Sequence, residues 1–77
     1  MAENYLQTPG STTTFYLKYL AGRKVLEICF RTKEIYHYLN LPLRVWKKYH
    51  KTVSAGGSSG KFFNEQIKDK YEFVKIT

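Results

Sequence analysis

The most concentrated chemistry in this chain is a cluster of basic residues around a tryptophan and a tyrosine, in the segment RVWKKYHK. Its four cationic residues have the spacing i, i+3, i+4 and i+7: Arg44, Lys47, Lys48 and Lys51. On a helix this spacing gathers them into a stripe about 100° wide. No acidic residue lies between positions 43 and 53, so the like charges repel one another without relief. Such a stripe suits contact with successive phosphates, and the alternative is an ordinary solvated helix face.

A pair of tyrosines offers a second kind of contact. Tyr36 and Tyr38 form a Tyr-x-Tyr pair, and aromatic rings on a sheet can stack on unpaired bases. We expect instead that both rings pack beneath helices, because a domain this small has few other large residues to fill its core. If one face of the sheet is open, the better candidates for contact are Tyr16, Lys18, Arg31 and His37.

The segment GGSSGK could hold a phosphate, since glycine-opened N–H groups before a helix form an anion-binding nest. The residues concerned are Ser58, Ser59 and Gly60, with Lys61 extending the basic surface. The full nucleotide-binding loop pattern fails, because Ala55 and Phe62 stand where Gly and Ser or Thr are required. Binding of a single phosphate and a plain helix-capping role are the two remaining interpretations.

The sequence assembles no catalytic or metal site. Neither His37 nor His50 has a sequence-local carboxylate, Cys or Ser to activate it. Cys29 is the one cysteine, so it forms no internal disulfide and has no zinc-ligand spacing. We therefore expect a non-catalytic protein with an inert thiol and without metal or cofactor.

Charge and length restrict the partners and the location. Thirteen Lys and Arg against six Asp and Glu give a net charge of +7, which favours polyanions such as RNA, or an acidic protein. No stretch approaches about 18 consecutive apolar residues, and the first residues do not resemble a secretion signal. We expect a cytoplasmic protein that does not contact the membrane.

Hydrophobic periodicity predicts the elements that position these residues. Alternation with period two predicts strands in three segments: TTTFYLKYLA, VLEICFR and IYHYLNL. In the first strand Phe15, Leu17 and Tyr19 share a face. A period of 3.6 residues after Pro42 predicts a helix over 43–53 with its aromatic residues facing inward and its bases facing water.

The second half continues with a flexible link over 54–60, a helix over 61–71 and a short last strand over 72–76. Ser58 or Ser59 can cap the second helix. Residues 1–11 contain Pro9-Gly10 and are expected to form a flexible arm, which leaves 12–77 as a single domain.

We therefore predict an α+β fold in the order βββααβ, in which two helices pack on one face of a small antiparallel sheet of three to four strands. The expected core consists of large apolar side chains: Leu26, Ile28, Phe30, Tyr36, Tyr38, Trp46, Tyr49, Phe63, Ile67 and Phe73.

Several of these segments, taken in order, resemble the KTSC domain, a short bacterial module. They are the LEICF strand, the central YHY, LNLP before the helix, and SSGKFFNEQIKDKYEF, of which the last is the most specific. The resemblance runs from about Thr13 to Ile76, and Lys33 stands where the family usually has a hairpin glycine. KTSC domains occur alone and at the C-terminus of some lysyl-tRNA synthetases, and RNA binding has been suggested for them.

Residues and resemblance together favour a non-catalytic module that binds RNA through the basic helix face. The alternative is a protein-binding adaptor in which a sheet edge or the basic face docks on an acidic partner.

Overall fold

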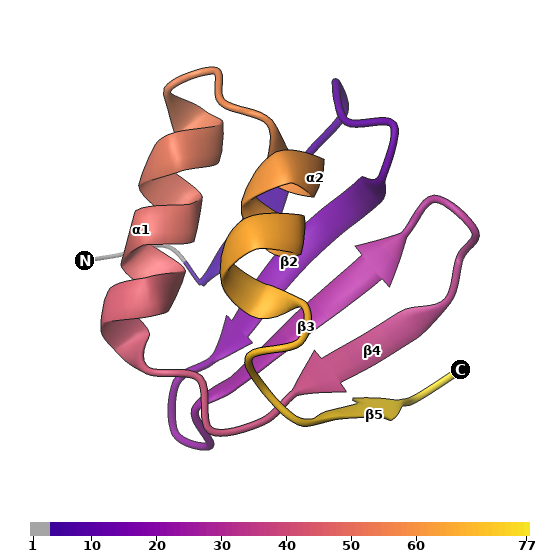
Figure 1. Ribbon diagram of the computed structural model, residues 1–77. Helices are drawn as coiled ribbons and strands as arrows, with labels where there is room; N and C mark the ends of the chain where they lie inside the picture. Colours follow the sequence, from indigo (N-terminus) through magenta and orange to yellow (C-terminus); the bar gives the residue numbers. More distant parts are fainter. Residues whose placement is uncertain (1–3) are drawn as a thin grey trace.

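The computed structural model describes residues 4–77 and shows a five-stranded antiparallel sheet with helices on one face (Figure 1). The strands follow the chain in the order β1-β2-β3-β4-β5. The elements are β1 (Tyr5–Gln7), β2 (Thr14–Leu20), β3 (Val25–Phe30), β4 (Ile35–Tyr38), α1 (Leu43–Ser54), α2 (Ser59–Phe62), a π-helical turn η1 (Phe63–Ile67) and β5 (Phe73–Lys75). The α+β class and the two helices on one face are confirmed.

The central strands β2 and β3 show why the sheet has one covered face. Leu17 lies opposite Ile28, and Tyr19 lies opposite Leu26, and all four side chains are buried. Because side chains alternate along a strand, these residues form the helix-facing side, while their neighbours point to the side without a helix. We call that second side the open face.

A bulge in β2 corrects one detail of the predicted alternation. The pairing register with β3 shifts between Thr14 and Tyr16, so Phe15 is 40% exposed and does not join Leu17 in the core. A bulge adds one residue to one strand and redirects the side chains around it. Phe15 instead lies beneath the guanidinium of Arg31, whose Cζ is 4.3 Å from the ring centroid.

The prediction of three to four strands is wrong, because β1 adds a fifth at the edge beside β2. Leu6 pairs with Leu17 and packs against the core, which anchors a strand of only three residues. β1 lies inside the segment 1–11 that the sequence predicts as an arm, and residues 1–3 of that segment lie outside the described part of the chain. So short a strand before Pro9-Gly10 gives almost no periodic signal.

The helix α1 follows the prediction closely. Pro42 is its N-cap, and Trp46 and Tyr49 on its inner side are completely buried. Trp46 stacks on Tyr19 of β2 with ring centroids 5.8 Å apart. These contacts fix the rotation of the helix, so the basic residues point to solvent.

The second helix is shorter than the predicted range of 61–71. Ser58 caps α2 by accepting a hydrogen bond from the Lys61 N–H at 3.1 Å, and the helix then widens into η1. Helical geometry ends at Ile67, because Lys68 has an extended ψ of 145°. The chain must turn back there so that β5 can pair with β4, as the hydrogen bond from the Leu39 N–H to the Glu72 carbonyl shows.

The predicted core is largely confirmed. Seven of its members are buried, and Phe30 and Tyr36 are partly buried against them. Phe73 is wrong, because β5 is an edge strand and its side chain is 57% exposed. Other buried members were not on the predicted list: Leu17, Tyr19, Leu41 and Phe62.

Candidate functional site

The basic face of α1, defined by Arg44, Lys47, Lys48 and Lys51, has the geometry that its spacing predicts. All four residues are exposed, and the first turn of the helix contains no acidic residue. Within residues 4–77 no carboxylate forms an ion pair with any of the four. The positive charge of this face is therefore not neutralised by any residue in the described part of the chain. Lys61 is also exposed, but it lies on α2.

The predicted phosphate residues have packing roles instead. Ser59 is only 3% exposed, and its Oγ lies 2.9 Å from Thr14 Oγ1 and 2.8 Å from the Tyr49 hydroxyl. A side chain at Gly60 would meet Thr13 Oγ1 at 2.5 Å, so glycine permits α2 to approach β2 closely. Ser58 serves as the helix cap. The capping interpretation fits these residues, and Ser59 and Gly60 have little surface to offer a phosphate.

The tyrosine pair lies on the helix-facing side of the sheet. Tyr38 is 5% exposed and packs edge-to-face on Phe63 with centroids 5.5 Å apart. Tyr36 is half-buried, with its ring 5.4 Å from that of Phe30. Burial raises the pKa of Tyr38 to about 12, so its hydroxyl stays protonated at neutral pH. These rings are part of the core and do not form an open stacking platform.

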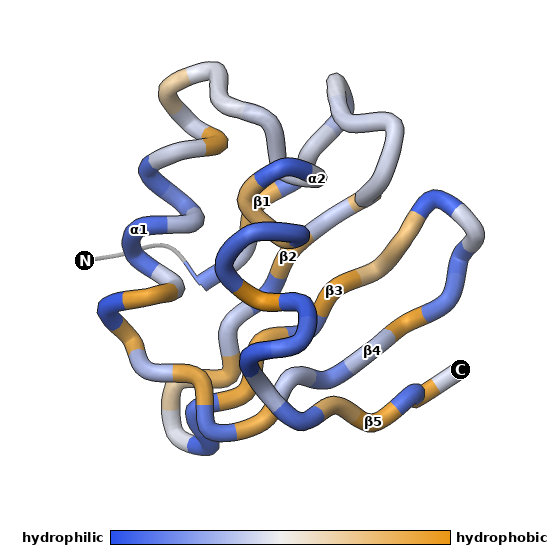
Figure 2. Tube along the Cα trace, viewed as in Figure 1, coloured by the Kyte–Doolittle hydropathy of each residue, from blue (hydrophilic) through white to orange (hydrophobic). Residues whose placement is uncertain are grey.

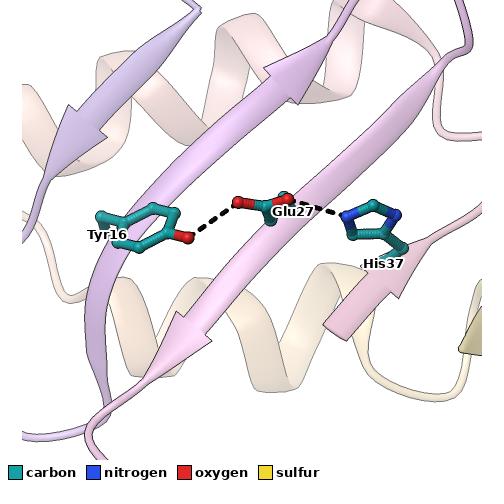
Figure 3. A network of polar contacts seen from close by, with 3 residues as sticks. All are labelled: Tyr16, Glu27 and His37. Carbon is teal, nitrogen blue, oxygen red and sulfur yellow. Dashed lines mark hydrogen bonds and ion pairs between the residues drawn. The ribbon is translucent and has the colours of Figure 1, made fainter. Parts of the chain in front are cut away.

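The open face carries a row of polar side chains from three neighbouring strands (Figure 3). Glu27 of β3 accepts a hydrogen bond from the Tyr16 hydroxyl at 2.7 Å through Oε2, and its Oε1 lies 2.8 Å from His37 Nε2. The strand register places Glu27 beside both partners. Of the sequence candidates for an open face, Tyr16 and His37 are thus brought together, and Glu27 was missed because its role depends on strand register.

The electrostatics of this row favour a carboxylate held by two donors. Burial alone would raise the pKa of Glu27, but the hydrogen bonds with His37 and Tyr16 outweigh burial and lower it. Burial and the hydrogen bond to Glu27 together raise the pKa of Tyr16. Both oxygens of the Glu27 carboxylate are occupied, so this carboxylate has little capacity left to act as a general base.

The thiol next to this row is not activated. Cys29 lies in β3 and is buried, and burial together with the charge of Glu27 raises the pKa of its thiol. Within residues 4–77 no group of three His, Cys, Asp or Glu side chains is placed to hold a metal ion.

A cleft on the helix-facing side is rich in aromatic rings. It has a volume of about 710 Å³ and lies between η1 and strands β3, β4 and β5. Its aromatic lining consists of Phe30, Tyr36, Tyr38, Phe63, Tyr71 and Phe73. We call it the aromatic cleft. The cleft could not be predicted from the sequence, because the gap between these rings forms only when η1 packs against the sheet.

The antiparallel sheet, the two covering helices and the cationic outer face define a small α+β domain. The model of the KTSC domain family matches residues 11–71, and the chain belongs to this family. A similar solved structure is that of a KTSC domain protein from Yersinia pestis, with 33% sequence identity and a TM-score of 0.73. The similarity covers 87% of this chain and 89% of that one.

None of the curated proteins compared with this chain matches it. In residues 4–77, no helix is both long and apolar enough to cross a bilayer.

Proposed function

We propose that this KTSC domain is a non-catalytic RNA-binding module that contacts the phosphate backbone through the basic face of α1. The observation that carries the proposal is the set of four exposed cations that no acidic residue of the described chain neutralises. Each unfavourable pair on a helix costs a few tenths of a kcal/mol, and a bound polyanion would relieve this repulsion.

The geometry supports contact with several phosphates at once. Arg44 and Lys51 are seven residues apart, which corresponds to about 10 Å along a helix axis. Each phosphate that a cation neutralises releases counterions and strengthens binding at low salt. Phosphate contacts carry no sequence information, so we expect little base selectivity from this face.

We propose RNA instead of duplex DNA as the ligand, because KTSC domains also occur at the C-terminus of some lysyl-tRNA synthetases. An RNA partner and a single unpaired cysteine both agree with a cytoplasmic location, which is part of the same proposal.

The second candidate function, a protein-binding adaptor, is favoured by a different surface, the edge of β5.

Charge reversal at Lys47, Lys48 and Lys51 tests the proposal. Replacing all three by Glu should abolish binding of a short single-stranded RNA in fluorescence anisotropy at low salt. The matched control reverses Arg23, Lys68 and Lys70, which are exposed elsewhere and change the net charge by the same amount. If both variants lose affinity equally, total charge and not the basic face determines binding, and the proposal fails.

A further inference from the structure

The edge of β5 presents unpaired backbone groups. β5 pairs with β4 alone, and the flanking hydrogen bonds run from Leu39 N–H to Glu72 O at 2.8 Å and from Ile76 N–H to Ile35 O at 2.7 Å. Because backbone groups alternate in an antiparallel ladder, the N–H and C=O groups of Phe73 and Lys75 point away from the sheet. Within the described residues these outward groups have no backbone partner.

The side chains of this edge are unusually apolar for a free strand. Phe73 is 57% exposed, and Val74 and Ile76 are each 49% exposed. Figure 2 shows the hydrophobic stretch that includes β5, interrupted by Lys75. Exposed edges are normally protected by charges, bulges or covering segments. Here the one charge on the strand is engaged, since Lys75 Nζ lies 2.7 Å from Glu34 Oε2.

The aromatic cleft lies directly beside the edge. The ring of Phe73 is 5.4 Å from that of Tyr36 and 5.6 Å from that of Tyr38, so Phe73 forms the outer wall of the cleft. Apolar clefts of this volume that contain a few polar groups are typical of binding sites. The helix-facing side chains of an added strand would lie beside Phe73 and Lys75, at the mouth of the cleft.

We propose that the β5 edge accepts an extended segment of another protein as a sixth strand, with a large apolar side chain placed beside Phe73 at the mouth of the aromatic cleft. In this mode the backbone hydrogen bonds supply affinity, and the pocket for alternate side chains supplies selectivity. The surface is separate from the basic face of α1, and the inference does not depend on RNA binding.

Charge favours a different protein over a second copy or RNA. Two copies would each bring a net charge of +7, so their mutual repulsion disfavours pairing through this edge. The charges around the cleft are mixed, because Lys68 and Asp69 lie together at its rim, which gives little attraction for a phosphate backbone. The partner segment should therefore be neutral to acidic, with apolar residues at alternate positions.

The test is selection from random dodecapeptides displayed on phage, at about 0.15 M salt, where charge attraction is screened beyond about 8 Å. Enriched peptides should carry large apolar residues at alternate positions. An NMR titration with one of them should shift the amide signals of β5 and of the residues that line the aromatic cleft.

Two variants of one residue isolate the strand pairing. Lys75→Pro removes an outward N–H without removing a hydrogen bond to β4, as proline permits at edge positions. Lys75→Ala loses the same ion pair with Glu34 but keeps the N–H. Lys75→Pro should weaken the peptide by about tenfold or more, the effect of one lost hydrogen bond, whereas Lys75→Ala should bind like the parent. If Lys75→Pro does not fold, Phe73→Asp replaces it, since that exposed position tolerates a charge that repels an apolar anchor.

Several outcomes would overturn the inference. They are a failure to enrich any peptide, signal changes confined to α1, equal affinities of the two Lys75 variants, and a dimer in sedimentation equilibrium that Lys75→Pro dissociates.

Discussion

His37 Nε2 lies 2.8 Å from Glu27 Oε1 on the open face of the sheet, and this contact joins β3 to β4 through their side chains. Tyr16 donates to the other oxygen of the same carboxylate and brings in β2. One glutamate thus links three strands on the side of the sheet where no helix contributes packing. The contact stabilises the fold and, with Tyr16, occupies both oxygens of the Glu27 carboxylate.

Acid should weaken this linkage. The folded-state pKa of Glu27 is below the ordinary value of 4.5, so its carboxylate stabilises the fold above that pH and the contribution is lost as the pH falls through the lowered value. We expect Glu27→Gln to reduce the free energy of unfolding by about 1 kcal/mol at pH 7. The difference from the parent should shrink toward pH 3 in urea titrations. Parallel pH curves for the two proteins would show that Glu27 does not contribute in this way.

Small side-chain substitutions where α2 packs against β2 should change the free energy of unfolding. Ser59→Ala removes one partner from each of the Thr14 and Tyr49 hydroxyls, which keep their contacts with Thr8 Oγ1 and the Ser59 carbonyl, and it should cost about 1 kcal/mol. Gly60→Ala should also destabilise, although alanine normally improves a helix by about 1 kcal/mol, because its Cβ would meet Thr13 Oγ1. Gly22→Ala is the control, since nothing lies within 4 Å of its added Cβ. Stabilisation by Gly60→Ala would disprove the close approach.

Tyr38 should behave as a core residue. Tyr38→Ala removes a ring that is 5% exposed and should cost about 3–5 kcal/mol. Tyr38→Phe keeps the ring and its edge-to-face contact with Phe63, so it should change the free energy of unfolding by less than about 1 kcal/mol. Thermal and urea unfolding of both variants measure the difference. If Tyr38→Ala were as stable as the parent, the ring would have to be exposed.

Lys33 occupies a turn position that favours glycine. Its φ is 72°, in the left-handed region, where an L side chain costs about 1 kcal/mol or more. Lys33→Gly should therefore raise the free energy of unfolding by about 0.5–1 kcal/mol. Lys33→Ala should not, since alanine retains the Cβ that causes the strain. Equal effects of the two substitutions would point to the lysine charge and not to the backbone.

The periodicity of apolar residues along the chain predicted the longer strands and the longer helix. The segments β2, β3 and α1 each contain at least six residues with a clear period, and the contrast between Trp46 and the bases fixed which side of α1 faces inward. The Ser58 cap was also predictable, because its preference depends on neighbours in the chain. These features need no knowledge of distant contacts.

Features that depend on register and packing could not be predicted from the sequence. β1 is held by Leu6 against the core, and the bulge at Phe15 is visible only when β2 is aligned with β3. The contact between Glu27 and its two donors likewise requires three strands in register. For the candidate site, the spacing of the four cations predicted which side of α1 is basic, whereas the burial of Ser59 depends on Thr14, which is 45 residues away in the chain.

The central claim, binding of RNA phosphates by the basic face, is tested most directly by the salt dependence of affinity. For a short single-stranded RNA, a plot of log K against log salt should have a slope of about −3 if all four cations contact phosphates, since each contributes about −0.7. The variant with Glu at positions 47, 48 and 51 should lose this slope together with measurable binding. Undetectable affinity of the parent protein at low salt, or an unchanged slope in the variant, would contradict the claim.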